Sequence, residues 1–257
     1  MRDRATFRQV GFAKEHPPVY LCPRCGSGLQ MTDLVIGRCA EAKQMHKYNP
    51  DEFCAEYDNG VFRCYFQCVS DHCAEVVQCV GQTWWDQRNW EEEGGYASEY
   101  YQGLTPTMFE PPLKVFDIPP NTPKRVRESI TASFRVLFLS TGSALNEVRN
   151  ALEFLMDHLE VPREGTSNGG KKYRLSLEGR VNLMQPPHEH YKELLIAVKW
   201  LGNYGTHAEE TTREDVLNAY DILYHVLDGM FSGNADRIKQ LAAGINAKEK
   251  AKKLAGS

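Results

Sequence analysis

Hydrophobic residues follow two different periods along the chain. In residues 61–68, Phe62, Cys64, Phe66 and Cys68 alternate with more polar residues, and residues 30–36 form a second β-like run. Such alternation is typical of a strand with one buried face. From residue 122 onward, apolar residues recur every three or four positions, which is the period of an amphipathic helix. The pattern therefore predicts a small β-rich module followed by a helical one.

The helical part is predicted to contain five helices. The first begins at Thr122, a suitable N-cap, with Pro123 at the first helical position. The last begins near residue 213, where Thr211 or Thr212 can cap it with an acidic residue three positions further on. Apolar stripes mark the others, which lie at about residues 148–159, 177–184 and 189–201. Short connections between such helices favour an antiparallel bundle.

Composition shifts divide the chain into five parts. We expect a polar arm at 1–16, a β-rich module at 17–83, an aromatic and proline-rich joint at 84–120, a helical bundle at 121–233 and a basic tail at 234–257. The joint is expected to pack between the two modules. A base-stacking platform is the alternative, but its cations are only Arg88 and Lys114, beside the acidic run 91–93. The predicted fold class is mainly α.

The overall charge and hydropathy argue against general attraction to nucleic acid and against insertion into a membrane. The 257 residues are 42% hydrophobic and 25% charged, with a formal net charge of −4. The molecule as a whole therefore does not attract nucleic acid, and any such contact requires a local basic patch. The first twenty residues lack the apolar core of a secretory signal, and no apolar run has membrane-spanning length. We expect a cytoplasmic protein without membrane contact.

All eight cysteines lie between Cys22 and Cys79. In a reducing compartment, clustered cysteines are more often metal ligands than disulfides. Cys22-x-x-Cys25 and Cys68-x4-Cys73 are two thiolate pairs, each at a predicted turn beside β-like sequence, which is the arrangement of a zinc ribbon. A closed site of four thiolates has no open coordination position, so we expect a structural zinc ion rather than a catalytic one.

Other ligands and other interpretations of the cysteines stay open at this stage. His72 can replace Cys73 as the fourth ligand, and Cys64 is a weaker substitute on the same strand face as Cys68. Buried free thiols are the alternative to a metal site. The remaining cysteines have no near partner in the sequence and are expected to be core or surface thiols; they are Cys39, Cys54 and Cys79.

Polar residues also collect at the predicted corner between the last two helices of the bundle. Residues 199–207 read Lys-Trp-Leu-Gly-Asn-Tyr-Gly-Thr-His, and Gly202 is expected to end the preceding helix. Asn203 and His207 then lie at a surface corner, where chemistry is often located. Taken alone, His207 is better explained as a turn residue that hydrogen-bonds to the backbone than as a catalytic residue.

The order of these parts resembles a known family. The zinc-ribbon-like start, the helix with Arg149-Asn-Ala-Leu-Glu153 and the Gly202-Asn-x-x-x-His207 corner are similar to domain-of-unknown-function family 4145. That family resembles a divergent branch of the HEPN (higher eukaryotes and prokaryotes nucleotide-binding) superfamily, whose members are helical bundles common in prokaryotic toxin and anti-phage defence systems.

The resemblance implies a metal-independent endoribonuclease that works as a homodimer. In such proteins a histidine acts on the ribose 2′-hydroxyl as acid or base and an arginine stabilises the phosphate. Asn203 and His207 match the motif, but Gly202 stands at the arginine position. Either Lys199 or Arg149 supplies the missing cation, or the bundle no longer cleaves RNA. Arg149 and Glu153 also have the spacing of a structural i,i+4 salt bridge.

Three functions of different class are compatible with this sequence. The first is a HEPN-like protein of defence or stress response that associates with RNA and cleaves it. The second is a non-catalytic interaction or regulatory module that docks a partner protein, as the loss of the motif arginine suggests. The third is a zinc-ribbon nucleic-acid binder that contacts phosphates through Arg24, Arg63 and the basic tail.

Overall fold

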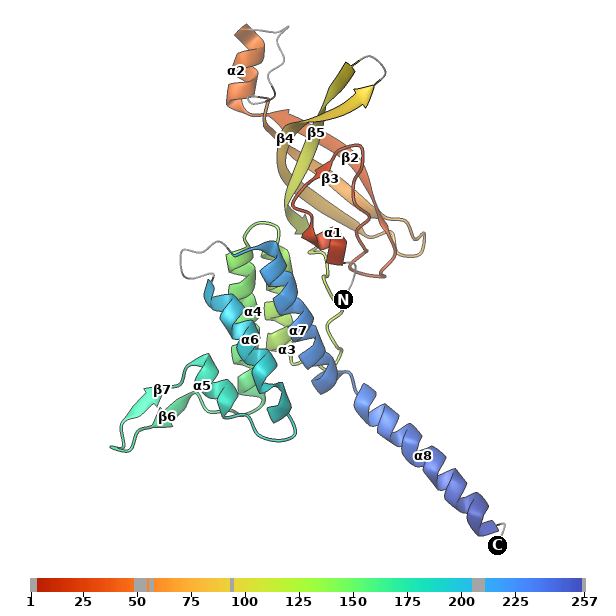
Figure 1. Ribbon diagram of the computed structural model, residues 1–257, viewed down its shortest axis with the longest axis vertical. Coiled ribbons are helices and arrows are strands. Elements are labelled where there is room, and N and C mark those ends of the chain that lie inside the picture. Colours follow the sequence, from red (N-terminus) through yellow and green to blue (C-terminus); the bar gives the residue numbers. More distant parts are fainter. Residues whose placement is uncertain (1–3, 49–54, 56–57, 93–94, 205–210, 256–257) are drawn as a thin grey trace.

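The computed structural model describes residues 4–48, 55, 58–92, 95–204 and 211–255 (Figure 1). The first half of the chain forms a β-sheet, the second half forms a helical bundle, and a last helix extends away from the bundle. Within the described residues, no helix combines the length and the apolar character that crossing a bilayer requires.

The sheet has five antiparallel strands in the order β1-β5-β4-β3-β2. Its strands are β1 (Phe12–Ala13), β2 (Leu29–Arg38), β3 (Gly60–Cys68), β4 (Val76–Glu92) and β5 (Gly95–Glu110). Buried and exposed residues alternate along β3, as predicted from the sequence. Two short helices lie in this half of the chain, α1 (Arg4–Arg8) in the predicted polar arm and α2 (Ala40–Tyr48) between β2 and β3. The sequence pattern predicted neither.

The prediction of a mainly α fold is wrong. Most of the segment 84–120, expected as a joint, belongs to β4 and β5, which pair along almost their whole length from Gln78↔Glu110 to Glu92↔Gly95. Tryptophan and tyrosine have high strand propensity, and cross-strand pairing uses it. The outer parts of β4 and β5 are exposed on both faces, so their sequence does not alternate between apolar and polar residues. Without this alternation, the acidic residues and glycines were not recognised as parts of strands. The protein therefore combines a substantial sheet with a helical bundle.

The predicted helices of the bundle are present. They are α3 (Lys124–Val136), α4 (Thr141–His158), α5 (Leu177–Asn182), α6 (Lys192–Tyr204), preceded by the 3-10 turn η1 (Glu189–Tyr191), and α7 (Arg213–Phe231). Thr212 and Asp215 form the expected capping box of α7. Helix α3 starts one residue later than predicted, with Pro123 at the N-cap. The segment between α4 and α5 contains a small hairpin, β6 (Glu164–Thr166) and β7 (Lys172–Arg174).

The sheet and the bundle share one hydrophobic core. Phe138, just after α3, packs against Phe109 of β5 with ring centroids 4.7 Å apart, and its ring is also edge-on to Tyr20. Polar contacts reinforce this junction at its rim. Arg4 of α1 forms ion pairs with Glu214 and Asp221 of α7. The predicted polar arm is therefore a structural element that joins the two halves of the molecule.

Helix α8 (Asn234–Ala255) differs from the rest because it extends away from the bundle (Figure 1). Gly233, with φ +70°, separates it from α7. Glycine adopts this left-handed conformation without steric cost, and it commonly follows the end of a helix.

Candidate functional site

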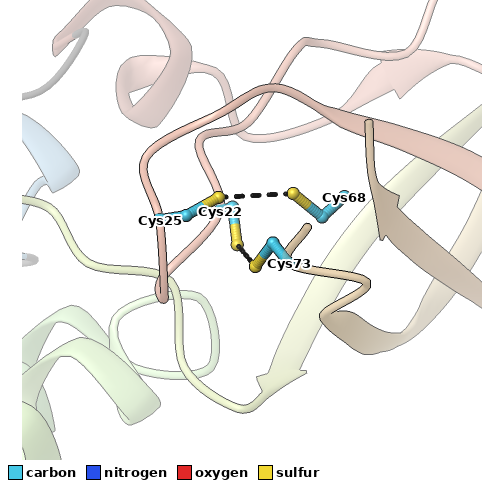
Figure 2. Close-up of side chains that lie close together, drawn as sticks. All are labelled: Cys22, Cys25, Cys68 and Cys73. Atoms are coloured by element: carbon cyan, nitrogen blue, oxygen red, sulfur yellow. Dashed lines mark hydrogen bonds between the residues drawn. The ribbon is translucent and has the colours of Figure 1, made fainter. Parts of the chain in front are cut away.

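Four cysteine thiols meet at the end of the sheet that faces the bundle (Figure 2). The Sγ atoms of Cys22 and Cys73 are 3.7 Å apart, and those of Cys25 and Cys68 are 3.4 Å apart. All four sulfur atoms lie within 4.8 Å of one another. Zn–S bonds of about 2.3 Å in a tetrahedron place the sulfur atoms about 3.8 Å apart, so these distances fit a single zinc ion.

The first thiol pair is set on a tight turn. The backbone N–H of Cys22 donates to the Ser27 carbonyl at 2.7 Å, and that of Gly26 donates to the Cys22 carbonyl at 3.0 Å. Gly26 has φ +79°, a conformation that favours glycine. The N–H of Arg24 donates to the Cys22 sulfur at 3.4 Å. The turn therefore points both thiols the same way.

The second pair is set on a matching turn between β3 and β4. Cys68 ends β3 and pairs with Leu29 of β2, which brings it beside the first turn. The N–H groups of Cys73 and Ala74 both donate to the Ser70 carbonyl, at 3.0 and 3.2 Å. Ala74 has a positive φ of 49°, so the chain turns sharply just after Cys73. Sheet pairing thus brings together two local turns that are far apart in sequence.

The surroundings of the four thiols lower the pKa of Cys25 and raise the pKa of Cys68. Hydrogen bonds from the side chain and backbone of Ser27 lower the pKa of Cys25 to about 6. The pKa of Cys68 is raised to about 12 in spite of a backbone hydrogen bond from Ser70, because desolvation and the neighbouring thiols oppose a further negative charge. A divalent cation removes this penalty by neutralising the thiolates together.

The structure selects among the alternative ligands. Within the described residues, the group that can hold a metal contains Cys22, Cys25, Cys68 and Cys73 and includes neither His72 nor Cys64. Cys64 instead lies directly opposite Cys79 in the β3–β4 ladder, and both are buried. Cys79 is a buried free thiol, as expected, and strand register rather than sequence spacing places it beside Cys64. Cys39 is a partly exposed free thiol, and Cys54 lies outside the described residues.

The predicted corner of the bundle is only partly described. Helix α6 continues through Gly202 to Tyr204, so Gly202 does not end the helix as expected. Asn203 is in the last turn of α6, but the structure does not describe its side chain. His207 lies outside the described residues. Whether the side chains of Asn203 and His207 converge on a cleft therefore stays a prediction.

The two candidate cations near this corner have different surroundings. The Nζ atom of Lys199 lies 3.0 Å from Glu178 Oε2 and 3.5 Å from the centroid of the Trp200 ring, and the residue is buried. Its ammonium group is already paired. Arg149 of α4 lies against Gly202, since a Cβ atom at Gly202 would be 3.9 Å from the Arg149 Cβ. Arg149 is partly exposed.

A buried arginine that sequence reasoning missed holds α5 against α4. Arg180 is 1% exposed, and its guanidinium donates to Glu153 Oε2 at 2.5 Å and to Asp157 Oδ1 at 2.7 Å. It also donates to the carbonyl oxygens of Glu153 and Val161. The sequence signal was an arginine on the apolar face that Leu177, Val181 and Met184 define. Glu153 and Asp157, four residues apart, provide the matching acidic pair.

Comparisons with known families divide the chain where the structure does. Residues 10–109, which hold the sheet, match the family model described as Domain of unknown function (DUF8608). Residues 131–255, which hold most of the bundle and α8, match Domain of unknown function (DUF4145), as the sequence resemblance predicted. No curated protein and no solved structure matched the chain. The two matches are therefore to different domains of unknown function, one over the sheet and the other over most of the bundle.

Proposed function

We propose that the protein is a zinc-stabilised, HEPN-like RNA-associated protein of a prokaryotic defence or stress response, whose bundle cleaves RNA without a catalytic metal. The observation that supports cleavage is the position of Arg149 against Gly202. Gly202 has no side chain to occupy this place, so the α4 arginine can supply the cation that the motif lacks. A guanidinium suits this role because it stays charged and bonds phosphate oxygens through two N–H groups.

The proposed chemistry is an internal transesterification. His207 accepts the proton of the ribose 2′-hydroxyl, and the 2′-oxygen attacks the adjacent phosphorus. The bond from phosphorus to the 5′-oxygen breaks, and that oxygen leaves with a proton as a 5′-hydroxyl. The products are a 2′,3′-cyclic phosphate and a 5′-hydroxyl end. Arg149 stabilises the extra negative charge on the phosphate oxygens in the transition state.

The test is an RNA cleavage assay in buffer without added metal. We expect wild-type protein to produce cyclic-phosphate ends, His207→Ala to be inactive, and Arg149→Ala to lose about 10²–10³ in rate. Arg149→Lys should restore part of the rate, which a purely structural role would not predict. Arg174→Ala, at an exposed arginine of β7, is the matched control. Absent cleavage by the wild type, or equal cleavage by wild type and His207→Ala, would remove the enzymatic proposal.

The sheet domain contributes a structural zinc site to this proposal. The four thiolates would hold zinc by themselves, so the ion would supply cross-linking of the two turns and no open coordination position. Its contribution to stability is large in small modules, where structural zinc binds with an apparent free energy on the order of 10–16 kcal/mol. One zinc per chain in elemental analysis of purified protein is the expected result.

A second candidate function is docking of a partner protein without catalysis. The observation that favours it is the pairing of Lys199 with Glu178, which leaves the motif without that cation. The same cleavage assay separates the two functions. Loss of all RNA cleavage together with retained binding to a partner protein would favour docking.

A further inference from the structure

Two elements project from opposite ends of the molecule (Figure 1). One is the projecting ribbon, which consists of residues 84–92 of β4 and 95–103 of β5. The last β3 partner of β4 is Gly60, opposite Thr83, and beyond it nine residue pairs from Trp84↔Gly103 to Glu92↔Gly95 join β4 and β5. At the base of the ribbon, Gly103 also pairs with Ala13 of β1. The other element is α8. Each extends from the shared core with little packing of its own.

Neither element is expected to be stable in isolation. A two-stranded ribbon is marginal in water, and an isolated helix gains most of its stability in proteins by packing an apolar face. The base of the ribbon is fixed by hydrogen bonds from Trp84 to Thr105 and from Trp85 to the Asp58 carbonyl. The backbone N–H of Lys14 also donates to the Gln102 carbonyl at 3.0 Å. Both elements would therefore gain stability from a binding surface outside their own chain.

Both elements expose large apolar side chains. On the ribbon, Tyr96 and Tyr100 are exposed, Tyr96 to 83%, and they share one face because they lie four residues apart in β5. Trp90 is also exposed, but it lies on the opposite face because its partner is Ala97. On α8, the exposed residues Ile238, Leu241 and Ile245 recur at i, i+3 and i+7, so they form one stripe along the helix. An apolar stripe gains no hydrophobic stabilisation from contact with phosphates or water, whereas packing on aromatic rings removes it from water and is favourable. This favours a protein surface over nucleic acid as the partner of α8.

The charges of the two elements are opposite. The segment 234–255 contains six lysine and arginine residues against two acidic ones. The segment 84–102 contains five acidic residues against one basic residue, Arg88. Two copies of α8 side by side would place like charges together, whereas α8 against a ribbon pairs opposite charges. Their lengths also agree, since 22 helical residues span about 33 Å and nine extended residue pairs about 30 Å.

We propose that α8 of one molecule binds the projecting ribbon of a second copy of this chain. The stripe of Ile238, Leu241 and Ile245 packs on Tyr96 and Tyr100, and the excess of basic residues in the segment 234–255 complements the excess of acidic residues in the ribbon. The two elements lie at opposite ends of one molecule, so the contact is intermolecular and head-to-tail. Such heterologous contacts form closed rings or open chains.

The test uses sedimentation velocity on the full chain and two sets of substitutions. The ribbon variant is Tyr96→Ser, Tyr100→Ser, and the helix variant is Ile238→Gln, Leu241→Gln, Ile245→Gln. All five positions are exposed, so both variants should keep the fold, which circular dichroism checks. The control is Leu183→Gln, which alters an exposed leucine of the bundle.

We expect wild type and control to form assemblies larger than those of either variant alone, because each variant can keep only the bundle dimer that the ribonuclease would use. A mixture of the two variants should form a complex that neither variant forms alone, because it retains one intact α8 and one intact ribbon. Raising the salt concentration should weaken wild-type association by about tenfold or more, since the pairing is partly electrostatic. These results do not depend on RNA cleavage, so they stand or fall separately from the proposed ribonuclease.

Three results would overturn the head-to-tail contact. The first is wild-type protein that stays monomeric at all concentrations, including the case in which α8 binds RNA or lipid vesicles instead. The second is a helix variant whose assemblies are as large as those of wild type. The third is a mixture of the two variants that forms no complex beyond those of each variant alone, although wild type forms larger assemblies.

Discussion

The ring of Phe138 lies against the ring of Phe109, and this contact joins the end of the first bundle helix to the last strand of the sheet. Phe109 in turn contacts Phe66 and Tyr20, so aromatic packing continues into the sheet. The two domains therefore share a core, although separate family models describe them.

Phe138→Ala should weaken this junction. Loss of a buried phenylalanine costs about 3–5 kcal/mol in a well-packed core, and Phe138 is 8% exposed. We expect a lower free energy of unfolding in urea, with the sheet and the bundle unfolding in separate transitions. Leu139→Ala, at the exposed neighbouring residue, is the control and should change stability by less than about 0.5 kcal/mol. Equal stability of the two variants would contradict a shared core.

Cys25→Ser should abolish metal binding, because three thiolates and a hydroxyl form a much weaker zinc site. We expect zinc content to fall from one per chain to near zero, and the melting temperature of the sheet domain to fall with it. Cys39→Ser changes a thiol outside the cluster and should keep both values. A wild-type protein whose melting temperature is unaffected by a strong chelator would show that no structural metal is held.

Arg180→Met should destabilise the bundle, because it leaves Glu153 and Asp157 without their buried partner. Removing one member of a buried ion pair typically costs about 3–5 kcal/mol. Arg163→Met is a matched control that also removes a guanidinium paired with Asp157, but this arginine is half exposed and its loss should cost about 1 kcal/mol or less. Thermal unfolding by circular dichroism measures both, and similar losses would contradict a special role for Arg180.

Acid should weaken the same cluster. Hydrogen bonds from Arg163 and then Arg180 lower the pKa of Asp157 from 3.8 to about 2. A carboxylate with a depressed folded-state pKa stabilises the fold fully above its unfolded pKa, and this stabilisation is lost as the pH falls through the folded pKa. The difference in unfolding free energy between wild type and Asp157→Asn should therefore shrink between about pH 5 and pH 2, by about 1 kcal/mol after allowance for solvent screening. A constant difference over this range would contradict the shifted pKa.

Several features of this protein follow from local sequence alone. The spacing within Cys22-x-x-Cys25 and Cys68-x4-Cys73 predicted the two turns and the four thiols that the structure brings together. Alternation along β3 and the helical period in the bundle predicted those elements, and the Thr212–Asp215 capping box marks the start of α7. These signals depend on residues within a few positions of one another.

Only the tertiary structure decided the features that depend on distant residues. The pairing of β4 with β5, the position of Cys79 opposite Cys64, and the contact of Arg4 with α7 all join segments whose local sequence carries no trace of the partner. In the sequence, Arg180 is a charged residue on an otherwise apolar helix face, which does not identify its partners. The packing of α5 against α4 places it beside the carboxylates of Glu153 and Asp157. Sequence determines which elements can form because their periods are local, whereas register and packing depend on which of many distant surfaces together bury the most apolar area and leave the fewest unpaired charges.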